Sequence, residues 1–157
     1  MSYFEDLSPW QFAGVTHDAL KAVGWLDAGK RYSKGAVTSQ FFEALLQLLV
    51  QPWQPVVAAG RHGCSLCRFS GGPGQITFGG ATVTIGASNV YVPGDGVIYV
   101  APSLVVHYVD AHEYQPPIEF MEAVLRCPPM RSLQYLRAIR ASGGSALTAS
   151  RKWTEVR

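Results

Sequence analysis

Residues 75–100 read QITFGGATVTIGASNVYVPGDGVIYV and set the architecture that we expect for this chain. Short runs of Val, Ile, Thr and Tyr alternate here with glycine-bearing turn sequences, which is typical of strands joined by tight turns. The pattern predicts strands over residues 76–78, 82–85, 89–92 and 97–100. Because the connections between them are so short, we expect the strands to form an antiparallel meander.

Helical patterns flank this stretch on both sides. Leu and Phe at i, i+3 and i+4 spacing predict a strong helix that is capped by Thr38 or Ser39 and ends at Gln51-Pro52. Ser8-Pro9 and Thr16-His17-Asp18 resemble helix N-caps and predict two shorter helices before it. Further segments are a strand over 56–59, helices over 104–111 and 118–126, and a helix that begins at Arg131-Ser132-Leu133, runs through Ile139 and fades at Gly143-Gly144. The predicted fold class is therefore α+β, with N-terminal helices, a central antiparallel sheet of short strands and C-terminal helices.

Composition limits the class of protein. The chain has 157 residues, of which 48% are hydrophobic and 15% charged, so it can bury a proper core and is not intrinsically disordered. No apolar stretch approaches the length of a membrane span, and the N-terminus has no signal-peptide pattern. An odd count of three cysteines argues against a disulfide framework. We therefore expect a cytoplasmic protein.

Charge is uneven along the chain although its net value is only +2. Residues 126–157 hold seven basic residues and one acidic residue, a balance of +6, which leaves −4 for the first 125 residues. We expect a single α+β domain over residues 1–143 and a basic, loosely packed tail over 144–157. Few aromatic residues interleave with Arg131, Arg137 and Arg140, so we expect a solvated helix face and no specific binding of nucleic acid.

Four residues form a candidate metal site. Cys64 and Cys67 make a C-x2-C motif, and His107 and His112 follow after 39 intervening residues. Thiolate and imidazole are the ligands of tetrahedral structural zinc. Residues five apart on a straight helix lie about 140° out of phase. The helix must therefore end or loosen near Asp110-Ala111 if both histidine rings are to converge on one ion.

Two resemblances bear on this site. The ligand pattern resembles a Cys2His2 zinc finger, but a finger has about twelve residues between its pairs, so the finger fold and its DNA-binding role do not carry over. Residues 89–108 and 112–120, NVYVPGDGVIYVAPSLVVHY and HEYQPPIEF, resemble a conserved bacterial domain family of unknown function. That resemblance implies a bacterial cytosolic protein and supplies no activity.

Other interpretations of these residues stay open. The cysteines could be core residues or a redox pair, His107 could be a hydrogen-bonded core histidine, and His112 could cap a helix. His62 and Cys127 are reserve ligands. A zinc-dependent hydrolase would need an open coordination position and a base such as Glu113 or His62, yet H-E-x-x-H, G-x-S-x-G and the zinc-deaminase motif are all missing.

The sequence favours a small zinc-binding domain with a structural Cys2His2 site. We expect it to serve as a binding or accessory module whose partner is a protein. The turn-rich residues 89–96 are a candidate binding surface, and the alternative function is the hydrolase.

Overall fold

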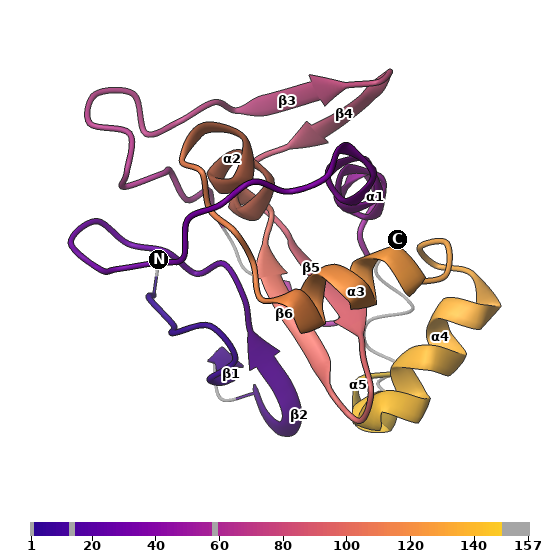
Figure 1. Ribbon diagram of the computed structural model, residues 1–157. Helices are drawn as coiled ribbons and strands as arrows, with labels where there is room; N and C mark the ends of the chain where they lie inside the picture. Colours follow the sequence, from indigo (N-terminus) through magenta and orange to yellow (C-terminus); the bar gives the residue numbers. More distant parts are fainter. Residues whose placement is uncertain (1, 13–14, 58–59, 149–157) are drawn as a thin grey trace.

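The computed structural model describes residues 2–12, 15–57 and 60–148, and it has the expected α+β fold (Figure 1). Its N-terminal half holds β1 (Pro9–Phe12), β2 (Val15–Ala22), α1 (Ser39–Val50), β3 (Gln75–Phe78) and β4 (Ala81–Thr84). Its C-terminal half holds β5 (Asn89–Pro93), β6 (Ile98–Pro102), α2 (Leu104–Ala111), α3 (Ile118–Arg126), α4 (Leu133–Ile139), the π-helical turn η1 (Arg140–Gly144) and α5 (Ser145–Thr148). The predictions for α1, α2, α3 and the four central strands are thus confirmed.

The strands do not form the predicted meander. They make one four-stranded sheet in the order β1-β2-β6-β5 and a separate two-stranded hairpin of β3 and β4. Strand β4 alternates buried Ala81 and Val83 with exposed Thr82 and Thr84, so it has one apolar face, which packs on α1. Strand β6 is buried along its whole length and needs a partner on each side. The chain therefore leaves the hairpin after β4 and starts a new sheet with β5.

The N-terminal helices that we predicted are strands. Strand β2 pairs parallel to β6, with Leu20 opposite Ile98 and Ala22 opposite Val100, and antiparallel to β1. The apolar residues Ala19, Leu20, Ala22 and Val23 span too short a stretch for their period to separate a helix from a strand. Pro9, which we took as a helix start, is the first residue of an edge strand, where a missing N–H does not break the sheet.

Two further differences lie in the connections. Val56 and Val57 are not in a strand, and the rest of that predicted strand, 58–59, is outside the described residues. The C-terminal helix does not fade at Gly143-Gly144. Gly143, with φ 100°, redirects the chain through η1 into α5, whose Leu147 packs on the core. Of the tail that we predicted over 144–157, residues 149–157 lie outside the described residues.

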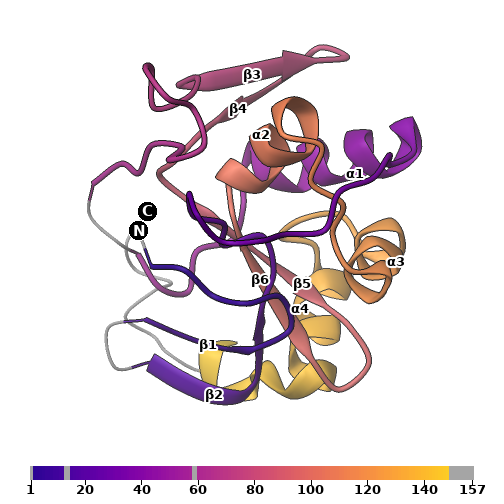
Figure 2. The ribbon, with the colours of Figure 1, turned by 60° about the vertical axis from the view of Figure 1, so that its left-hand side comes forward.

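Both faces of the main sheet are covered. On β6, Tyr99 and Ala101 face a cluster built with α1, α2 and α3, while Ile98 and Val100 face a cluster with Trp10, Trp25 and the residues of α4. This alternation is the two-residue period of a strand. Figure 2 shows α1, α2 and α3 on one side of β5 and β6 and the β3–β4 hairpin beyond α2. Helix α2 thus lies between the sheet and the segment that carries the cysteines.

Candidate metal centre

The two cysteines stand on a tight turn between α1 and β3. The N–H of Cys67 donates a hydrogen bond to the carbonyl oxygen of Cys64 over 3.3 Å. Ser65 Oγ donates to Asp27 Oδ1 over 2.8 Å and accepts from the N–H of Ala28 over 3.0 Å. These bonds fix the turn to the loop that precedes α1. The backbone that carries both sulfurs is therefore held in place.

The two histidines stand on α2 and at its end. His107 lies in the middle of the helix and is only 4% exposed. His112 is the C-cap residue with φ −120° and ψ 16°, and Glu113 follows with φ 56°. The helix therefore ends at Ala111, as the spacing predicted. Its end brings the two imidazole rings to a centroid distance of 5.0 Å at an interplanar angle of 88°.

The four side chains converge on one point. One ligand atom from each of Cys64, Cys67, His107 and His112 lies within 4.8 Å of the other three. Cys67 Sγ lies 3.3 Å from His107 Nε2 and 3.4 Å from His112 Nε2, and Cys64 Sγ lies 3.4 Å from His112 Nε2. A sulfur and a nitrogen bound tetrahedrally to one zinc ion are about 3.6 Å apart. The cluster thus has the dimensions and the donor atoms of a tetrahedral metal site.

Burial sets the electrostatics of this cluster. Burial lowers the pKa of His107, and the neighbouring His112 lowers it further, so the neutral imidazole that binds a metal is favoured. Burial raises the pKa of the Cys64 thiol, although hydrogen bonds from the N–H groups of Cys67 and Leu66 lower it. A buried Cys64 thiolate with the half-buried Cys67 thiolate beside it needs a positive charge nearby, and a divalent cation would supply it.

Tyr108 closes the inner side of the cluster. Its side chain is fully buried, and its hydroxyl has no hydrogen-bond partner among the described residues. Burial raises the pKa of Tyr108, and the nearby Cys64, Asp27 and Cys67 raise it further. The Tyr108 hydroxyl therefore stays protonated near neutral pH.

The glycine loop that follows the cysteines is a part of the site that sequence reasoning missed. This loop reads Gly71-Gly72-Pro73-Gly74 and begins four residues after Cys67. Gly72 has φ 86°, and a Cβ atom there would lie 3.0 Å from Cys64 Cβ and 3.2 Å from His107 Nε2. The N–H of Cys64 also donates to the carbonyl oxygen of Gly71. The sequence signal that could have identified this loop is the short distance along the chain between the glycine run and the C-x2-C motif.

The reserve ligands lie apart from the cluster. His62 is exposed and lines a different cavity, and its N–H donates to the carbonyl oxygen of Gly86 over 2.9 Å. Cys127 caps the end of α3 and packs between the two apolar clusters, where burial raises the pKa of its thiol to about 12. Such a thiol is chemically inert near neutral pH.

Glu113, the proposed hydrolytic base, is exposed. Its carbonyl oxygen accepts a hydrogen bond from the N–H of Gly35 over 3.0 Å. It lines a cavity with Lys34 and Asp110 that includes none of the four cluster residues. Glu113 therefore sits beside His112 in sequence without sharing a cavity with the cluster.

Fold and site together define a protein of the α+β class with a Cys2His2 cluster that could hold a metal ion. The chain belongs to the family described as a domain of unknown function, DUF7919, whose model matches residues 2–125. That range includes all four cluster residues and ends just before α3 does. The searches of curated proteins and of solved structures found no match. Within the described part of the chain, every helix is too short or too polar to cross a bilayer.

Proposed function

We propose that this chain is a small zinc-binding domain in which Cys64, Cys67, His107 and His112 hold one structural zinc ion. The observation that carries the proposal is the convergence of two sulfurs and two imidazole nitrogens within 4.8 Å. Sulfur and imidazole donors favour zinc over the hard cations magnesium and calcium, which take oxygen ligands. Three free thiols also suit a reducing compartment such as the bacterial cytoplasm.

The role that we propose for the ion is to cross-link the fold. It would join the turn at residues 64–67 to α2 across 39 residues of chain that carry β3 to β6. Closing a long loop removes much conformational entropy from the unfolded chain, and the binding free energy of a structural zinc is folding free energy. The domain would then act as a binding or accessory module whose partner is a protein.

A structural ion is favoured over the hydrolase alternative by the number of donors. Catalytic zinc has three protein ligands and an open position for water, whereas four side chains converge here. A general base must also reach the metal-bound water. Glu113 is exposed in a cavity with Lys34, and His62 lines a different cavity, so neither is placed for that task.

Elemental analysis of freshly purified, tag-free protein tests the proposal directly. We expect about one zinc per chain in the parent and in Cys127→Ser, and much less in Cys64→Ser, because only the last variant loses a donor atom. Parent protein without zinc or another transition metal would contradict the proposal.

Thermal unfolding tests the structural role separately. We expect Cys64→Ser to lower Tm by about 10 °C or more, since each kcal/mol is worth about 2–4 °C in a chain of this size. A strong chelator should lower Tm of the parent similarly and leave Cys64→Ser almost unchanged. Glu113→Gln is the control that should keep the Tm of the parent, and Cys127→Ser should lower Tm much less than Cys64→Ser, because Cys127 lies outside the cluster. If Glu113→Gln abolished a hydrolytic activity without changing Tm, the hydrolase would be the better account.

A further inference from the structure

The β3–β4 hairpin has one edge that no other strand covers within the described part of the chain. Strand β3 pairs with β4 alone, in a sheet of two strands. In Figures 1 and 2, β3 is the outer strand of the hairpin, and β4 lies between it and the helices α1 and α2. The open edge of β3 therefore faces away from the rest of the domain.

The main-chain groups on this edge belong to Gln75 and Thr77. The N–H of Ile85 donates to the carbonyl oxygen of Gly74 over 2.9 Å, so these two residues form a hydrogen-bonded pair. Hydrogen-bonded and non-hydrogen-bonded pairs alternate along an antiparallel ladder, and the register with β4 is regular. The N–H and C=O groups of Gln75 and Thr77 therefore point away from β4. Both residues are exposed, so another chain can reach these groups.

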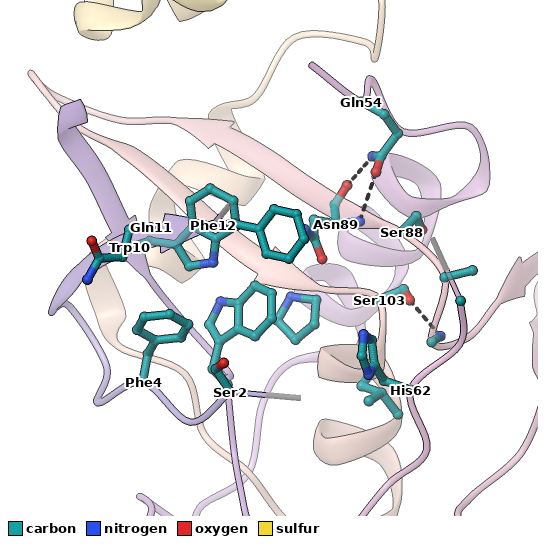
Figure 3. A pocket seen from close by; sticks show the side chains of 16 residues that line it. Ser2, Phe4, Trp10, Gln11, Phe12, Gln54, His62, Ser88, Asn89 and Ser103 are labelled. Atoms are coloured by element: carbon teal, nitrogen blue, oxygen red, sulfur yellow. Dashed lines mark hydrogen bonds between the residues drawn. The ribbon is translucent and has the colours of Figure 1, made fainter. Parts of the chain in front are cut away.

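The polar groups of the cavity in Figure 3 are engaged to a greater extent. The side chain of Gln54 exchanges hydrogen bonds with the main chain of Asn89, and Ser103 Oγ accepts from the N–H of Gly86. On the edge of β3, by contrast, two N–H and two C=O groups have no partner among the described residues. The edge is therefore the better candidate for an interaction surface.

The edge also lacks the features that usually keep exposed edges from pairing. Natural proteins protect edge strands with charged side chains, with proline or with a β-bulge. Residues 75–78, QITF, contain no charged residue and no proline, and they pair with β4 without a bulge. Phe78, at the end of the strand, is 43% exposed. An uncharged, regular edge with an exposed ring favours the addition of another strand.

The beginning of β3 is positively charged. The exposed Arg61 lies beside Gly74, where an added Cβ atom would be 3.6 Å from Arg61 Nη1. Residues 44–94 contain Arg61 and Arg68 and no Asp or Glu. The stretch of chain around the first residue of β3 therefore carries no carboxylate of its own to neutralise Arg61.

The end of β3 has the opposite charge. Phe78 lines one shallow cavity together with Glu43 and a second one with three charged residues from other segments. The charged residues that share a cavity with Phe78 are Glu43, Asp110, Glu113 and Lys34. Three carboxylates against one ammonium group leave this end of the strand net negative.

We propose that the edge of β3 pairs antiparallel with the same edge of a second copy of this chain. Gln75 pairs with Thr77 of the second copy, and Thr77 pairs with its Gln75. The two pairs exchange four main-chain hydrogen bonds around a twofold axis at Ile76. Only residues 75–78 of each copy take part in the pairing, so the dimer is weak and depends on concentration.

Charge complementarity identifies the second copy as the occupant. In this register Gly74 lies opposite Phe78 of the second copy, so Arg61 comes near Glu43 of that copy. Each positive end therefore meets a negative end, at both ends of the pairing. The inference names the partner of the binding module proposed above and rests on that part of the proposed function, but it does not require the zinc ion.

Sedimentation velocity of the full chain at rising concentration tests the proposal. We expect reversible association, with the amide NMR signals of Gln75 and Thr77 shifting as the dimer forms. Thr77→Pro should weaken the dimer at least about tenfold, because it removes two of the four bonds. Thr82→Pro is the matched control. It breaks the same hydrogen bond between the hydroxyls of Thr77 and Thr82, but its lost N–H lies on the other edge of the hairpin, so it should associate as the parent does.

Reversal of the charges tests the register without changing the strand. Arg61→Glu and Glu43→Arg should each weaken the dimer at least about tenfold, because like charges then meet at both ends, and the double variant should restore it. A parent that stays monomeric at every concentration would overturn the proposal and leave the edge to an extended segment of another protein. Equal association of Thr77→Pro and Thr82→Pro would also overturn it. Zinc content, measured on the same samples, separates these outcomes from a failure of the metal site.

Discussion

At the scale of single residues, the metal cluster depends on a residue without a side chain. Gly72 lies against both Cys64 and His107, and its φ of 86° is one that other residues adopt at a cost. Gly80, in the turn between β3 and β4, has nearly the same φ of 80° but open space around its Cα. Both glycines therefore need a positive φ, and they differ only in the atoms that an added Cβ would contact.

This pair gives a prediction with a built-in control. Both Gly72→Ala and Gly80→Ala should lose about 1–2 kcal/mol to backbone strain. Only Gly72→Ala should also weaken the metal site, by about tenfold in affinity, since overpacking of a close contact costs about 1–3 kcal/mol. Titration of zinc against a chromophoric chelator measures the difference. Equal zinc affinities in the two variants would contradict this prediction. They would show that His107 can move away from a Cβ atom at position 72, placed 3.2 Å from its Nε2, without weakening the metal site.

At the scale of elements, the end of α2 is held by two tyrosines. Tyr114 is fully buried and donates from its hydroxyl to Asp6 Oδ2 over 2.7 Å, and the N–H of Gly24 donates to Asp6 Oδ1 over 2.9 Å. Tyr32 donates from its hydroxyl to the carbonyl oxygen of His112 over 3.0 Å. Both bonds position the last turn of α2, but only Asp6 is a titrating acceptor.

Removing the bond to Asp6 should give a pH-dependent loss of stability. Burial raises the pKa of Asp6, and Glu5 raises it further, against the bonds from Gly24 and Tyr114. Because the folded pKa is raised, ionised Asp6 costs stability, and this cost disappears as the pH falls through that pKa. Tyr114→Phe removes one donor from the carboxylate and should cost about 1.5–3 kcal/mol near pH 7, and less near pH 4.

Tyr32→Phe is the matched control for this experiment. Its acceptor is a backbone carbonyl, so its cost should be about 1 kcal/mol at both pH values. Denaturant unfolding of the parent and both variants at each pH measures the differences, and the comparison at one pH cancels any change in metal binding that all three share. A Tyr114→Phe cost that grew as the pH fell would contradict the assignment of Asp6.

At the scale of the whole molecule, the metal cluster lies where two segments far apart in the sequence meet. Helix α2 supplies His107 and ends beside the cluster at His112, and the loop between α1 and β3 supplies Cys64 and Cys67. A metal ion bound at the cluster should therefore hold this loop against the helix.

We accordingly expect metal removal to loosen the loop that carries the cysteines. The N–H of Cys64 donates to the carbonyl oxygen of Gly71, and the N–H of Cys67 donates to that of Cys64. Adding a strong chelator should speed hydrogen exchange at these two N–H groups, and added zinc should slow it again. Cys127→Ser, which alters neither segment, should respond to the chelator as the parent does. Equal exchange with and without zinc in a chain that stays folded would show that the loop does not depend on the cross-link.

Local sequence patterns were sufficient to predict much of the fold and the four residues of the cluster. The spacing of Phe41, Leu45 and Leu49 predicted α1, and the glycine-separated runs predicted β3 to β6. The C-x2-C motif and the two histidines predicted the cluster, including the end of α2 at Ala111. These features depend on residues close in sequence or on the donor chemistry of side chains, and both can be judged without knowing which segments meet.

Long-range pairing decided the rest. Strand β2 is a strand because Leu20 pairs with Ile98, 78 residues further along the chain, and no local period contains that partner. The hairpin separates from the main sheet because β6 takes β2 as its second neighbour, which leaves β4 to pack on α1. Gly72 meets His107, and Trp10 packs against Trp25, only after folding. Contacts of this kind arise from the competition among all segments for buried partners, which periodicity and composition do not record.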